Sequence, residues 1–419
     1  MKLEDLKGHR VVMFGAGREG QAVAEVVKRL LPDLEFVMTD DKPETMPRLE
    51  DAIAQSDANT IVIKSPGIPP SHPALLEFRE RGVTFTTSTN LFFAERKGKG
   101  KLIGVTGTKG KSTTASLIAH VLKTAGMPVE LVGNIGDAAI NHVDAPDETI
   151  FVVELSSYHL MDLDVAPDIA VVTNLLEEHM DYHGSVEAYH EAKMRIVTLQ
   201  SASDVLVADE EDSALQSWIK KSAVRHLSFA QATDALLDQL AIKGGHNRNN
   251  ARAVVALARD LNVSDEVIAK AFQTFEPLPH RLQEIGPVNG ILFVDDSIST
   301  IPEATLAAID LYADRLGSII LGGQDRGYNF DALAERLKPL NIKVFVMPGG
   351  DRLQEALAKA VVPFTPITEL KEAVEASFKT LKHGQVCLLS PGSPSYGQFK
   401  NFEHRAEVFK QAIDSCASP

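Results

Sequence analysis

Short apolar runs alternate with amphipathic stretches along almost the whole chain. The run RVVMFG, residues 10–15, has the length of a buried strand, and residues 18–30 after it carry apolar side chains at helical spacing. A second strand-like run, residues 35–40, follows. Strands that alternate with helices in this way predict βαβ units and parallel sheets. We therefore expect an α/β protein.

The pattern falls into three blocks, which predict three domains. The basic stretch 95–101 is expected to link the first two blocks, and the turn-rich stretch 276–281 separates the second from the third. The first and third domains are expected to be Rossmann-like, and the central one to combine a parallel sheet with a phosphate-binding loop. The predicted domains are residues 1–97, 98–277 and 278–419.

The third block begins with a strand and an amphipathic segment, residues 302–316. We expect this segment to be one helix that packs on the sheet. Its apolar face is expected to hold Leu306, Ile309, Ala313 and Leu316.

Composition and charge narrow the classes of function. The 419 residues carry a net charge of −15, which argues against nucleic acid or an anionic membrane surface as the main partner. Two cysteines cannot make a disulfide framework. The charged start of the chain predicts no signal peptide, and no apolar run is long enough to span a membrane. We expect a cytoplasmic protein without membrane insertion.

The stretch LIGVTGTKGKSTT, residues 102–114, has the composition of a phosphate-binding loop between a strand and a helix. The common P-loop pattern requires glycine at position 105, where this chain has Val105. Backbone N–H groups and the helix start would surround phosphate oxygens, with a cation from Lys111 and a hydroxyl for Mg²⁺ from Ser112. The alternative is a glycine-rich turn that binds nothing. The loop residues expected at a nucleotide are Gly107, Thr108, Lys109, Gly110, Lys111, Ser112 and Thr113.

A second glycine motif, GAGREG at residues 15–20, follows the first predicted strand. Asp40 ends the next strand, where a dinucleotide-binding fold has its acidic ribose partner. The motif fits a dinucleotide, another nucleotide in a Rossmann-like domain, or only a tight turn. Ser65 and Gly67 follow the apolar run 60–63 and would lie beside this loop at the same sheet edge.

Polar residues also follow two predicted strands of the second block. Glu154 ends the strand FVVE, and the next strand leads into TNLLEEHMDYHG. Carboxylate and imidazole groups near a phosphate loop suit Mg²⁺ between ATP and a substrate, whereas zinc would need a closed set of three or four ligands. The alternative is a solvated acidic loop. The candidates in this stretch are Asn174, Glu177, Glu178, His179, Asp181 and His183.

Spacing alone leaves two further features undecided. Lys193 lies on a predicted helix, where a lysine is ordinarily exposed to solvent unless a metal site adjoins it. Asn247 and Asn250 are three residues apart and would share a helical face. Both asparagines are compatible with a nucleotide contact and with simple helix capping.

Taken together, the motifs resemble those of the Mur ligase family, the ATP-dependent amino-acid ligases that build the peptidoglycan stem peptide. ELSSYHL, the short first domain and the FKNFEHR ending look most like the branch that adds glutamate to UDP-N-acetylmuramoyl-L-alanine. The matching stretches, in family order, are GVTGTKGKSTT, VGNIG, ELSSYHL, TNLLEEHMDYHGS, AYHEAK, GGHNRNNA, LPHR, DDS, ILGGQDRG and LLSPGSPSYGQFKNFEHR.

The resemblance implies a role for each matched residue. The catalytic residues would be Lys111, Glu154, His179 and Lys193. Mg²⁺ would be held by Ser112, Glu154, His179 and Lys193, the last after carbamylation by CO₂. ATP would also contact Asn247, Asn250, Arg281 and Asp296. The UDP-sugar substrate would contact Gly15, Gly17, Arg18, Asp40, Ser65, Gly67, Asn134 and Ser156. Glutamate would contact Thr300, Arg326, Ser395 and Phe402.

The implied reaction forms a peptide bond through an acyl phosphate. Transfer of the γ-phosphoryl group of ATP activates the substrate carboxylate, the amine of glutamate attacks, and ADP and phosphate are released. Closure of the third domain would bring glutamate to the acyl phosphate. The resemblance also implies a monomer that acts in peptidoglycan synthesis, cell shape and cell division.

The glutamate pocket departs from the family pattern. D-glutamate ligases usually carry a lysine where this chain has Ile298, and an aspartate is common where it has Gly397. DSIST, GGQDRG and SPGSPSYG are closer to a branch that adds L-glutamate. D-glutamate is the family default, and L-glutamate is the rival expectation.

Three other readings remain open. The first glycine motif alone predicts a nicotinamide-dependent dehydrogenase, which would leave the phosphate loop and Lys193 unexplained. A regulator that binds nucleotide without catalysis is a second alternative. Another amide-forming ligase of the Mur type is a third.

Overall fold

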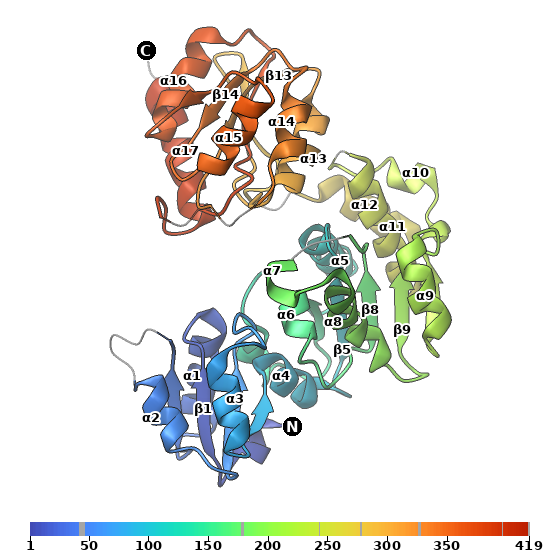
Figure 1. Cartoon of the computed structure of the whole chain (residues 1–419). Helices are drawn as coiled ribbons and strands as arrows, with labels where there is room; N and C mark the ends of the chain where they lie inside the picture. The colour runs from blue at the N-terminus through green and yellow to red at the C-terminus, as the bar shows by residue number, and fades with distance from the viewer. Residues whose placement is uncertain are drawn as a thin grey trace. The chain divides into compact units, whose positions relative to one another are not determined.

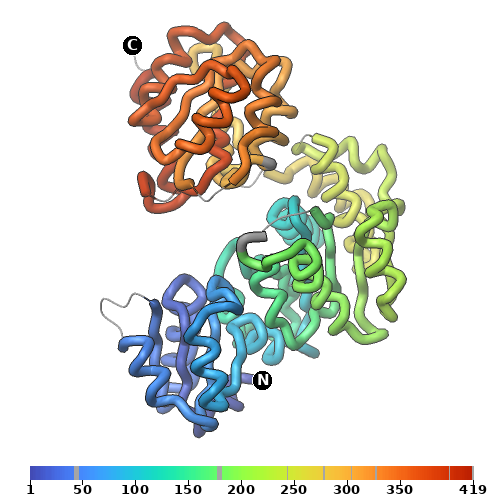
Figure 2. The backbone as a smooth tube through the Cα atoms, in the orientation of Figure 1, coloured from blue at the N-terminus to red at the C-terminus, as the bar shows by residue number. Residues whose placement is uncertain are grey.

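The computed structural model contains three β-sheets with helices packed on their faces (Figure 1). This is the α/β architecture with parallel sheets in three domains that the sequence predicts. The chain divides into two compact units, Met1–Glu276 and Pro277–Pro419. The structure describes residues 1–41, 47–176, 180–242, 244–276, 279–325, 328–395 and 397–417, and the remaining residues are grey in Figure 2.

The first sheet has the strand order β2-β1-β3-β4, and all neighbouring strands are parallel. Helices α1 and α4 pack on one face with Val11, and α2 and α3 cover the other face around Val12. Neighbouring residues of a strand face opposite sides, so both layers receive apolar side chains. The elements are η1 (Leu3–Leu6), β1 (Arg10–Phe14), α1 (Arg18–Leu30), β2 (Phe36–Thr39), α2 (Leu49–Ala54), β3 (Thr60–Lys64), α3 (Pro73–Glu80), β4 (Thr84–Thr86) and α4 (Ser88–Arg96).

The second sheet is also parallel, with the order β10-β9-β8-β5-β7-β6. Helices α5, α11 and α12 cover one face, and α6, α8 and α9 cover the other. The elements are β5 (Lys101–Thr106), α5 (Lys111–Thr124), β6 (Val129–Gly133), η2 (Ala139–His142), β7 (Ile150–Glu154), α6 (Ser157–Leu160), β8 (Ile169–Val172), α7 (Met180–His183), α8 (Val186–Thr198), β9 (Val205–Ala208), α9 (Ser213–Lys221), β10 (Arg225–Ser228), η3 (Phe229–Gln231), α10 (Asp234–Leu237), α11 (Gly245–Asp260) and α12 (Asp265–Thr274).

The third sheet has the order β11-β12-β16-β13-β14-β15, and only the edge strand β11 runs antiparallel to its neighbour among the described strands. Helices α13, α14 and α15 pack on one face, and α16 and α17 on the other. The elements are β11 (Gln283–Val288), β12 (Ile291–Asp295), α13 (Pro302–Tyr312), β13 (Leu316–Leu321), α14 (Asp331–Leu337), β14 (Lys343–Val346), α15 (Asp351–Lys359), β15 (Thr365–Pro366), α16 (Leu370–Thr380), β16 (Val386–Leu389) and α17 (Phe402–Ala417).

The stretch expected to link the first two domains is packed in place. The buried Arg96 donates hydrogen bonds to the carbonyls of Ala145 at 2.6 Å and Pro146 at 2.8 Å. A Cβ added at Gly100 would lie 2.1 Å from the Thr149 carbonyl oxygen. One apolar cluster joins α4 to both sheets, so the two predicted domains fold as one compact unit. Their division at residues 97 and 98 stays a prediction, as does the division at residues 277 and 278.

The helix expected over residues 302–316 is shorter than predicted. Helix α13 ends at Tyr312, and Leu316 is the first residue of the buried strand β13. The prediction was wrong at this end because apolar spacing does not distinguish the last turn of a helix from the start of a buried strand. Ile309 does face the core, as expected.

Candidate active site

In the central sheet, the order in which the chain adds strands reverses at β5. Strand β5 lies between β7 and β8, so the chain proceeds first to one side of β5 and then to the other. In open α/β sheets, ligands bind outside the carboxyl ends of strands at such a point. The glycine-rich loop 107–110 follows β5 and leads directly into α5.

The loop's backbone requires glycine at two positions. Gly107 and Gly110 have φ angles of 141° and 81°. A Cβ at Gly107 would lie 1.9 Å from the Thr173 hydroxyl oxygen, and one at Gly110 would lie 2.4 Å from the Asn250 side-chain oxygen. The glycines therefore allow the loop to pack directly on its neighbours. Asn247 and Asn250 are both buried on α11. Asn250 adjoins the loop, and a role in a nucleotide site requires such a position.

Residues after β8 brace the same loop. The Thr173 hydroxyl donates to the Lys109 carbonyl at 2.6 Å. The Asn174 side chain accepts from Lys109 N–H at 2.9 Å and donates to the Lys109 carbonyl at 3.0 Å. Asn174, expected among the metal-site candidates, therefore holds the loop in shape.

Two lysines converge on the base of the loop. The Lys111 ammonium donates to the carbonyls of Gly107 at 3.0 Å and Thr108 at 2.6 Å. Lys193, from α8, donates to the same Gly107 carbonyl at 2.8 Å and is 1% exposed. The ordinary expectation of a solvent-exposed Lys193 is therefore wrong. Its nitrogen also lies 4.8 Å from the centre of the Tyr189 ring.

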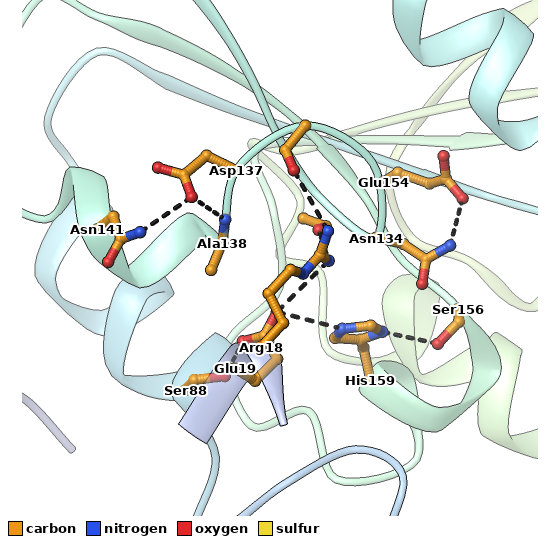
Figure 3. Close-up of polar contacts among 12 residues, drawn as sticks. Arg18, Glu19, Ser88, Asn134, Asp137, Ala138, Asn141, Glu154, Ser156 and His159 are labelled. Atoms are coloured by element: carbon orange, nitrogen blue, oxygen red, sulfur yellow. Dashed lines mark hydrogen bonds and ion pairs between the residues drawn. The ribbon is translucent and has the colours of Figure 1, made fainter. Parts of the chain in front are cut away.

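Glu154, at the end of β7, is buried with one carboxylate oxygen unoccupied by hydrogen bonds. Its Oε1 accepts from the Asn134 side-chain amide at 2.9 Å (Figure 3). Its Oε2 is buried and has no hydrogen-bond partner among the described residues. A buried carboxylate oxygen without a donor is costly, and a divalent cation is the ligand that would satisfy it. The donor chemistry at Glu154 therefore fits Mg²⁺.

The structure describes only part of the expected metal set. No group of three His, Cys, Asp or Glu side chains suited to a metal occurs in the described part of the chain. Glu177, Glu178 and His179 lie outside the described residues. Ser112 is buried in the first turn of α5. A metal ion here would draw ligands from Glu154, a hydroxyl and phosphate oxygens.

Loops that follow the strands of the first sheet meet at one corner. Gly15, with a φ of 108°, lies so near Ser65 that a Cβ would be 2.6 Å from the serine Cβ. The Ser65 hydroxyl donates to the Gly15 carbonyl at 3.2 Å, and Asp40 accepts from Ala16 N–H at 2.7 Å. Gly17 is the residue before α1. Gly15, Gly17, Asp40 and Ser65 thus come together as expected, at the strand-order reversal between β1 and β3. A Cβ on Gly67 would meet nothing within 4 Å.

Arg18, Asn134 and Ser156 are the other residues expected at the sugar nucleotide. Arg18 reaches the loop after β6, which carries Asn134. The Ser156 hydroxyl is 2.6 Å from Nδ1 of His159. His159, which spacing did not single out, also lies 4.0 Å from the Glu19 carboxylate.

In the C-terminal unit, Asp296 is almost fully buried after β12. It accepts from Ser390 Oγ at 2.6 Å and from Leu282 N–H at 3.2 Å. Burial raises its pKa to about 6, and these hydrogen bonds together with the charge of Arg281 oppose the rise. Arg281 and Asp296, both expected at ATP, are therefore close enough to interact.

In this unit, one buried arginine donates to two of three loops that bond to one another. Arg405, from α17, is 0% exposed and donates to the carbonyls of Ser297 at 2.7 Å and Ser393 at 3.1 Å. Burial lowers its pKa to about 10, so it remains a cation at neutral pH. The loops also bond to one another through Gly392 N–H and Ser299 carbonyl, Gly322 N–H and Pro391 carbonyl, and Gln324 N–H and Pro394 carbonyl.

The residues expected at glutamate lie on or beside these loops. Thr300 follows β12, the buried Ser395 follows β16, and Phe402 begins α17. Arg326 lies outside the described residues. Arg405 was missed because an arginine on an amphipathic helix ordinarily predicts a surface position.

Comparison with known proteins places the chain in a family. The family description "Mur ligase middle domain" matches residues 105–258. The chain is 36% identical to UDP-N-acetylmuramoyl-L-alanine--L-glutamate ligase of Micromonospora sp., over 100% of this chain and 99% of that protein. The chain belongs to the Mur ligase family. It is also 33% identical to UDP-N-acetylmuramoylalanine--D-glutamate ligase of Streptococcus agalactiae, over 97% of each chain.

Solved Mur ligase structures share the fold of this Mur ligase. The MurF ligase of Thermotoga maritima in complex with ADP matches with a TM-score of 0.64 and 17% identity, over 99% of this chain and 96% of that one. UDP-N-acetylmuramate-alanine ligase MurC of the same organism gives 0.61 and 18%, over 97% and 99%. Among the described helices of this Mur ligase, none has the length and apolarity needed to cross a bilayer.

Asp296 gives this Mur ligase a measurable pH dependence of stability. The folded carboxyl holds its proton more tightly than the unfolded one, since its pKa is about 6 against an ordinary 3.8. Its contribution to the free energy of unfolding therefore falls as pH rises from about 4 to about 6, by ~3 kcal/mol at 1.36 kcal/mol per pKa unit. We expect urea unfolding to show that the free energy of unfolding of wild type, relative to that of Asp296→Asn, is lower by about this much at pH 7 than at pH 4. A difference independent of pH would contradict the burial of a titrating carboxyl.

Proposed function

We propose that this protein is an ATP-dependent ligase that joins glutamate to UDP-N-acetylmuramoyl-L-alanine, giving ADP and phosphate, in the cytoplasmic synthesis of peptidoglycan precursors. The observation that carries the proposal is the convergence of Lys111 and Lys193 on one glycine-rich loop. Glu154, with its unpartnered Oε2, ends the strand that neighbours β5. The chain that builds this site aligns along its whole length with ligases named for this reaction.

The loop and the start of α5 supply the ATP site of the proposal. Backbone N–H groups of residues 107–113 and the positive end of the helix attract phosphate oxygens. Lys111, now bonded to two loop carbonyls, would turn to the outer phosphates. Asn250 adjoins the loop from α11, and Asn247, Arg281 and Asp296 are proposed to contact the nucleotide as well.

Mg²⁺ is proposed to bind at Glu154 and Ser112, with His179 completing the set. When bound, it neutralises charge on the phosphoryl group in transit. Lys193 is proposed to carry a CO₂-derived carbamate. Its amine, after losing a proton, would add to CO₂ and lose a second proton, which gives an anionic metal ligand. Its burial beside the loop supports this role, because a positive charge on a buried side chain is costly.

The chemistry then divides between activation and attack. The corner at Gly15, Gly17, Asp40 and Ser65 would anchor UDP, with Arg18, Gly67, Asn134 and Ser156 along the sugar nucleotide. The alanyl carboxylate attacks the γ-phosphorus, and ADP departs. The amine of glutamate, after losing a proton, attacks the acyl carbon, and the carbon–oxygen bond to phosphate breaks. Lys111 would stabilise the charge that develops on the phosphoryl oxygens.

L-glutamate is the enantiomer that we infer, and D-glutamate is the alternative. Ile298, half-buried beside the three loops, offers no cation where D-glutamate ligases usually carry lysine. Relatives of Micromonospora and Salinispora named for L-glutamate are 36% and 35% identical to this chain. The relative of Streptococcus agalactiae named for D-glutamate, at 33%, keeps the alternative open.

A phosphate-release assay tests the function and the enantiomer together. Release should require Mg²⁺-ATP, UDP-N-acetylmuramoyl-L-alanine and glutamate at once, and should be faster with L-glutamate than with D-glutamate. Faster turnover with D-glutamate would reverse the enantiomer and keep the reaction class. No ADP with either enantiomer would overturn the proposed function.

Replacing Arg405 should weaken the binding of glutamate more than the binding of ATP. The Arg405→Lys variant keeps the positive charge. Lysine lacks the planar guanidinium group, so it cannot donate to the Ser297 and Ser393 carbonyls at the same time. Loss of one charge-assisted hydrogen bond is worth about 1.5–3 kcal/mol, so we expect the KM for glutamate to rise about tenfold or more, with the KM for ATP within about twofold. Arg336→Lys, on the exposed face of α14 with Asp310, is the matched control. An unchanged KM for glutamate would show that Arg405 does not shape this pocket.

A further inference from the structure

The first turn of α1 reaches a loop that lies beside Glu154 (Figure 3). Arg18 Nη2 donates to the Gly133 carbonyl at 2.5 Å, and its Nη1 donates to the Gly136 carbonyl at 3.3 Å. Arg18 belongs to the first sheet's α1, whereas the loop 133–136 follows β6 of the central sheet. One guanidinium therefore connects the proposed diphosphate corner to the central sheet.

The loop that Arg18 grips has little freedom of its own. Gly133 and Gly136 have φ angles of 106° and 72°. A Cβ on Gly133 would lie 2.5 Å from the Glu154 carbonyl oxygen, and one on Gly136 would lie 2.5 Å from the Leu131 carbonyl oxygen. Gly133 thus packs against β7 and Gly136 against β6. Arg18 bonds to the backbone carbonyls of both glycines.

Asn134 transmits the position of this loop to Glu154. Its backbone N–H donates to the Glu154 carbonyl at 3.0 Å, and its side-chain amide donates to Glu154 Oε1 at 2.9 Å. These bonds fix the carboxylate so that its buried Oε2 is the oxygen without a donor. A shift of the loop would move the amide and release the carboxylate.

Glu19 holds the same turn of α1 from the other side. It accepts from the Ser88 hydroxyl at 2.5 Å and faces His159, whose ring bonds to Ser156. Burial alone would raise the pKa of Glu19, but the hydrogen bonds and charge of His159 and the bond from Ser88 hold it below its usual value. Glu19 is therefore an anion at neutral pH, and the turn that presents Arg18 is fixed.

We propose that Arg18 is a positioning residue for Glu154, acting through the loop 133–136 and Asn134. The inference rests on the proposed function, since it takes Glu154 as a ligand of the divalent ion. Arg18 also stands at the start of α1, beside the proposed diphosphate corner. Its guanidinium has five N–H donors and uses two of them on the loop, so it can hold the loop and meet an anion together.

A double-mutant cycle on metal affinity tests this connection. Mn²⁺ binding is measured by electron paramagnetic resonance in protein saturated with the ATP analogue AMP-PNP, for wild type, Arg18→Met, Asn134→Ala and the double variant. Partners of metal ligands are worth 10–100-fold in affinity, so each single variant should bind Mn²⁺ about tenfold more weakly. Because both substitutions interrupt the same chain of contacts, the double variant should also bind Mn²⁺ only about tenfold more weakly than wild type.

Arg29→Met is the matched control. Arg29 also extends from α1, and it bonds to Asp144 and Asn141. None of its hydrogen bonds or ion pairs to described residues reaches the loop 133–136. Its Mn²⁺ affinity should equal that of wild type, and Arg18→Lys should fall between wild type and Arg18→Met. Thermal melting of each variant checks that the fold is retained.

Three results would overturn the proposal. They are wild-type Mn²⁺ affinity in Arg18→Met, multiplicative losses of about 100-fold in the double variant, and an equal loss in Arg29→Met. Each of these can occur while wild-type protein still forms the ligated product, which leaves the proposed function standing. A wild-type protein that makes product but binds no Mn²⁺ would overturn the role of Glu154 and this inference with it.

Discussion

Replacing Lys193 by alanine is expected to lower kcat about 10³-fold while the protein stays folded. Lys193 is buried at the base of the phosphate loop and donates to the Gly107 carbonyl. If its carbamate completes the metal site, the variant loses an anionic ligand, and single electrostatic groups of this kind are worth about 10²–10³ in kcat or more. Turnover is measured as phosphate release with saturating substrates.

Chemical rescue distinguishes a metal ligand from a packing residue. Short carboxylates such as formate or acetate can occupy the space left by Lys193→Ala and should restore part of the lost rate, about tenfold, whereas chloride should not. Glu191→Ala, an exposed position on the same helix, should keep wild-type turnover. Unchanged activity in Lys193→Ala would discard the carbamate, and a loss that no carboxylate repairs would reduce Lys193 to a structural role.

Glu154→Gln is expected to lower kcat about 10²–10³-fold and to raise the Mg²⁺ concentration that gives half-maximal rate. Glutamine keeps the shape and can still accept from Asn134, but it removes the negative charge that the free Oε2 offers to a cation. The stability of the ligand-free variant should equal or exceed that of wild type, because an unpaired buried carboxylate oxygen is costly.

Opposite effects on activity and stability are the signature of a binding site. Glu130→Gln, an exposed position on β6, should change neither. Activity assays across a Mg²⁺ titration, together with thermal melting without ligands, measure both quantities. A Glu154→Gln protein with normal turnover, or with turnover lost only because it melts earlier, would contradict the metal-ligand role.

The sequence predicted those parts of the fold that depend on local pattern. Helix α1 begins and ends where apolar spacing placed it, and the phosphate loop lies between a strand and a helix as its glycines required. These features follow from residues close together in the chain. Helix α13 was predicted too long because Leu316 fits both a helical face and a buried strand.

The candidate site was less accessible to sequence because its contacts join distant residues. Asn134 and Glu154 form a hydrogen bond between the ends of two neighbouring strands, and the local sequence around either residue does not predict it. Lys193 has the spacing of a surface lysine, yet the packing of α8 buries it. Arg405 is similar, because the loop carbonyls that accept its hydrogen bonds come together only in the folded unit. Resemblance to a family singled out Lys193 and Asn134. It included Arg405 in a matching stretch and gave this residue no role.

Oxygen transfer from substrate to phosphate tests the central claim most directly. UDP-N-acetylmuramoyl-L-alanine is labelled with ¹⁸O in both oxygens of its alanyl carboxylate and is turned over with Mg²⁺-ATP and glutamate. An acyl phosphate leaves one labelled oxygen in the released phosphate and one in the new amide, which mass spectrometry of both products detects. Phosphate that carries one ¹⁸O is the predicted result. Phosphate released without label while the amide forms would contradict the account.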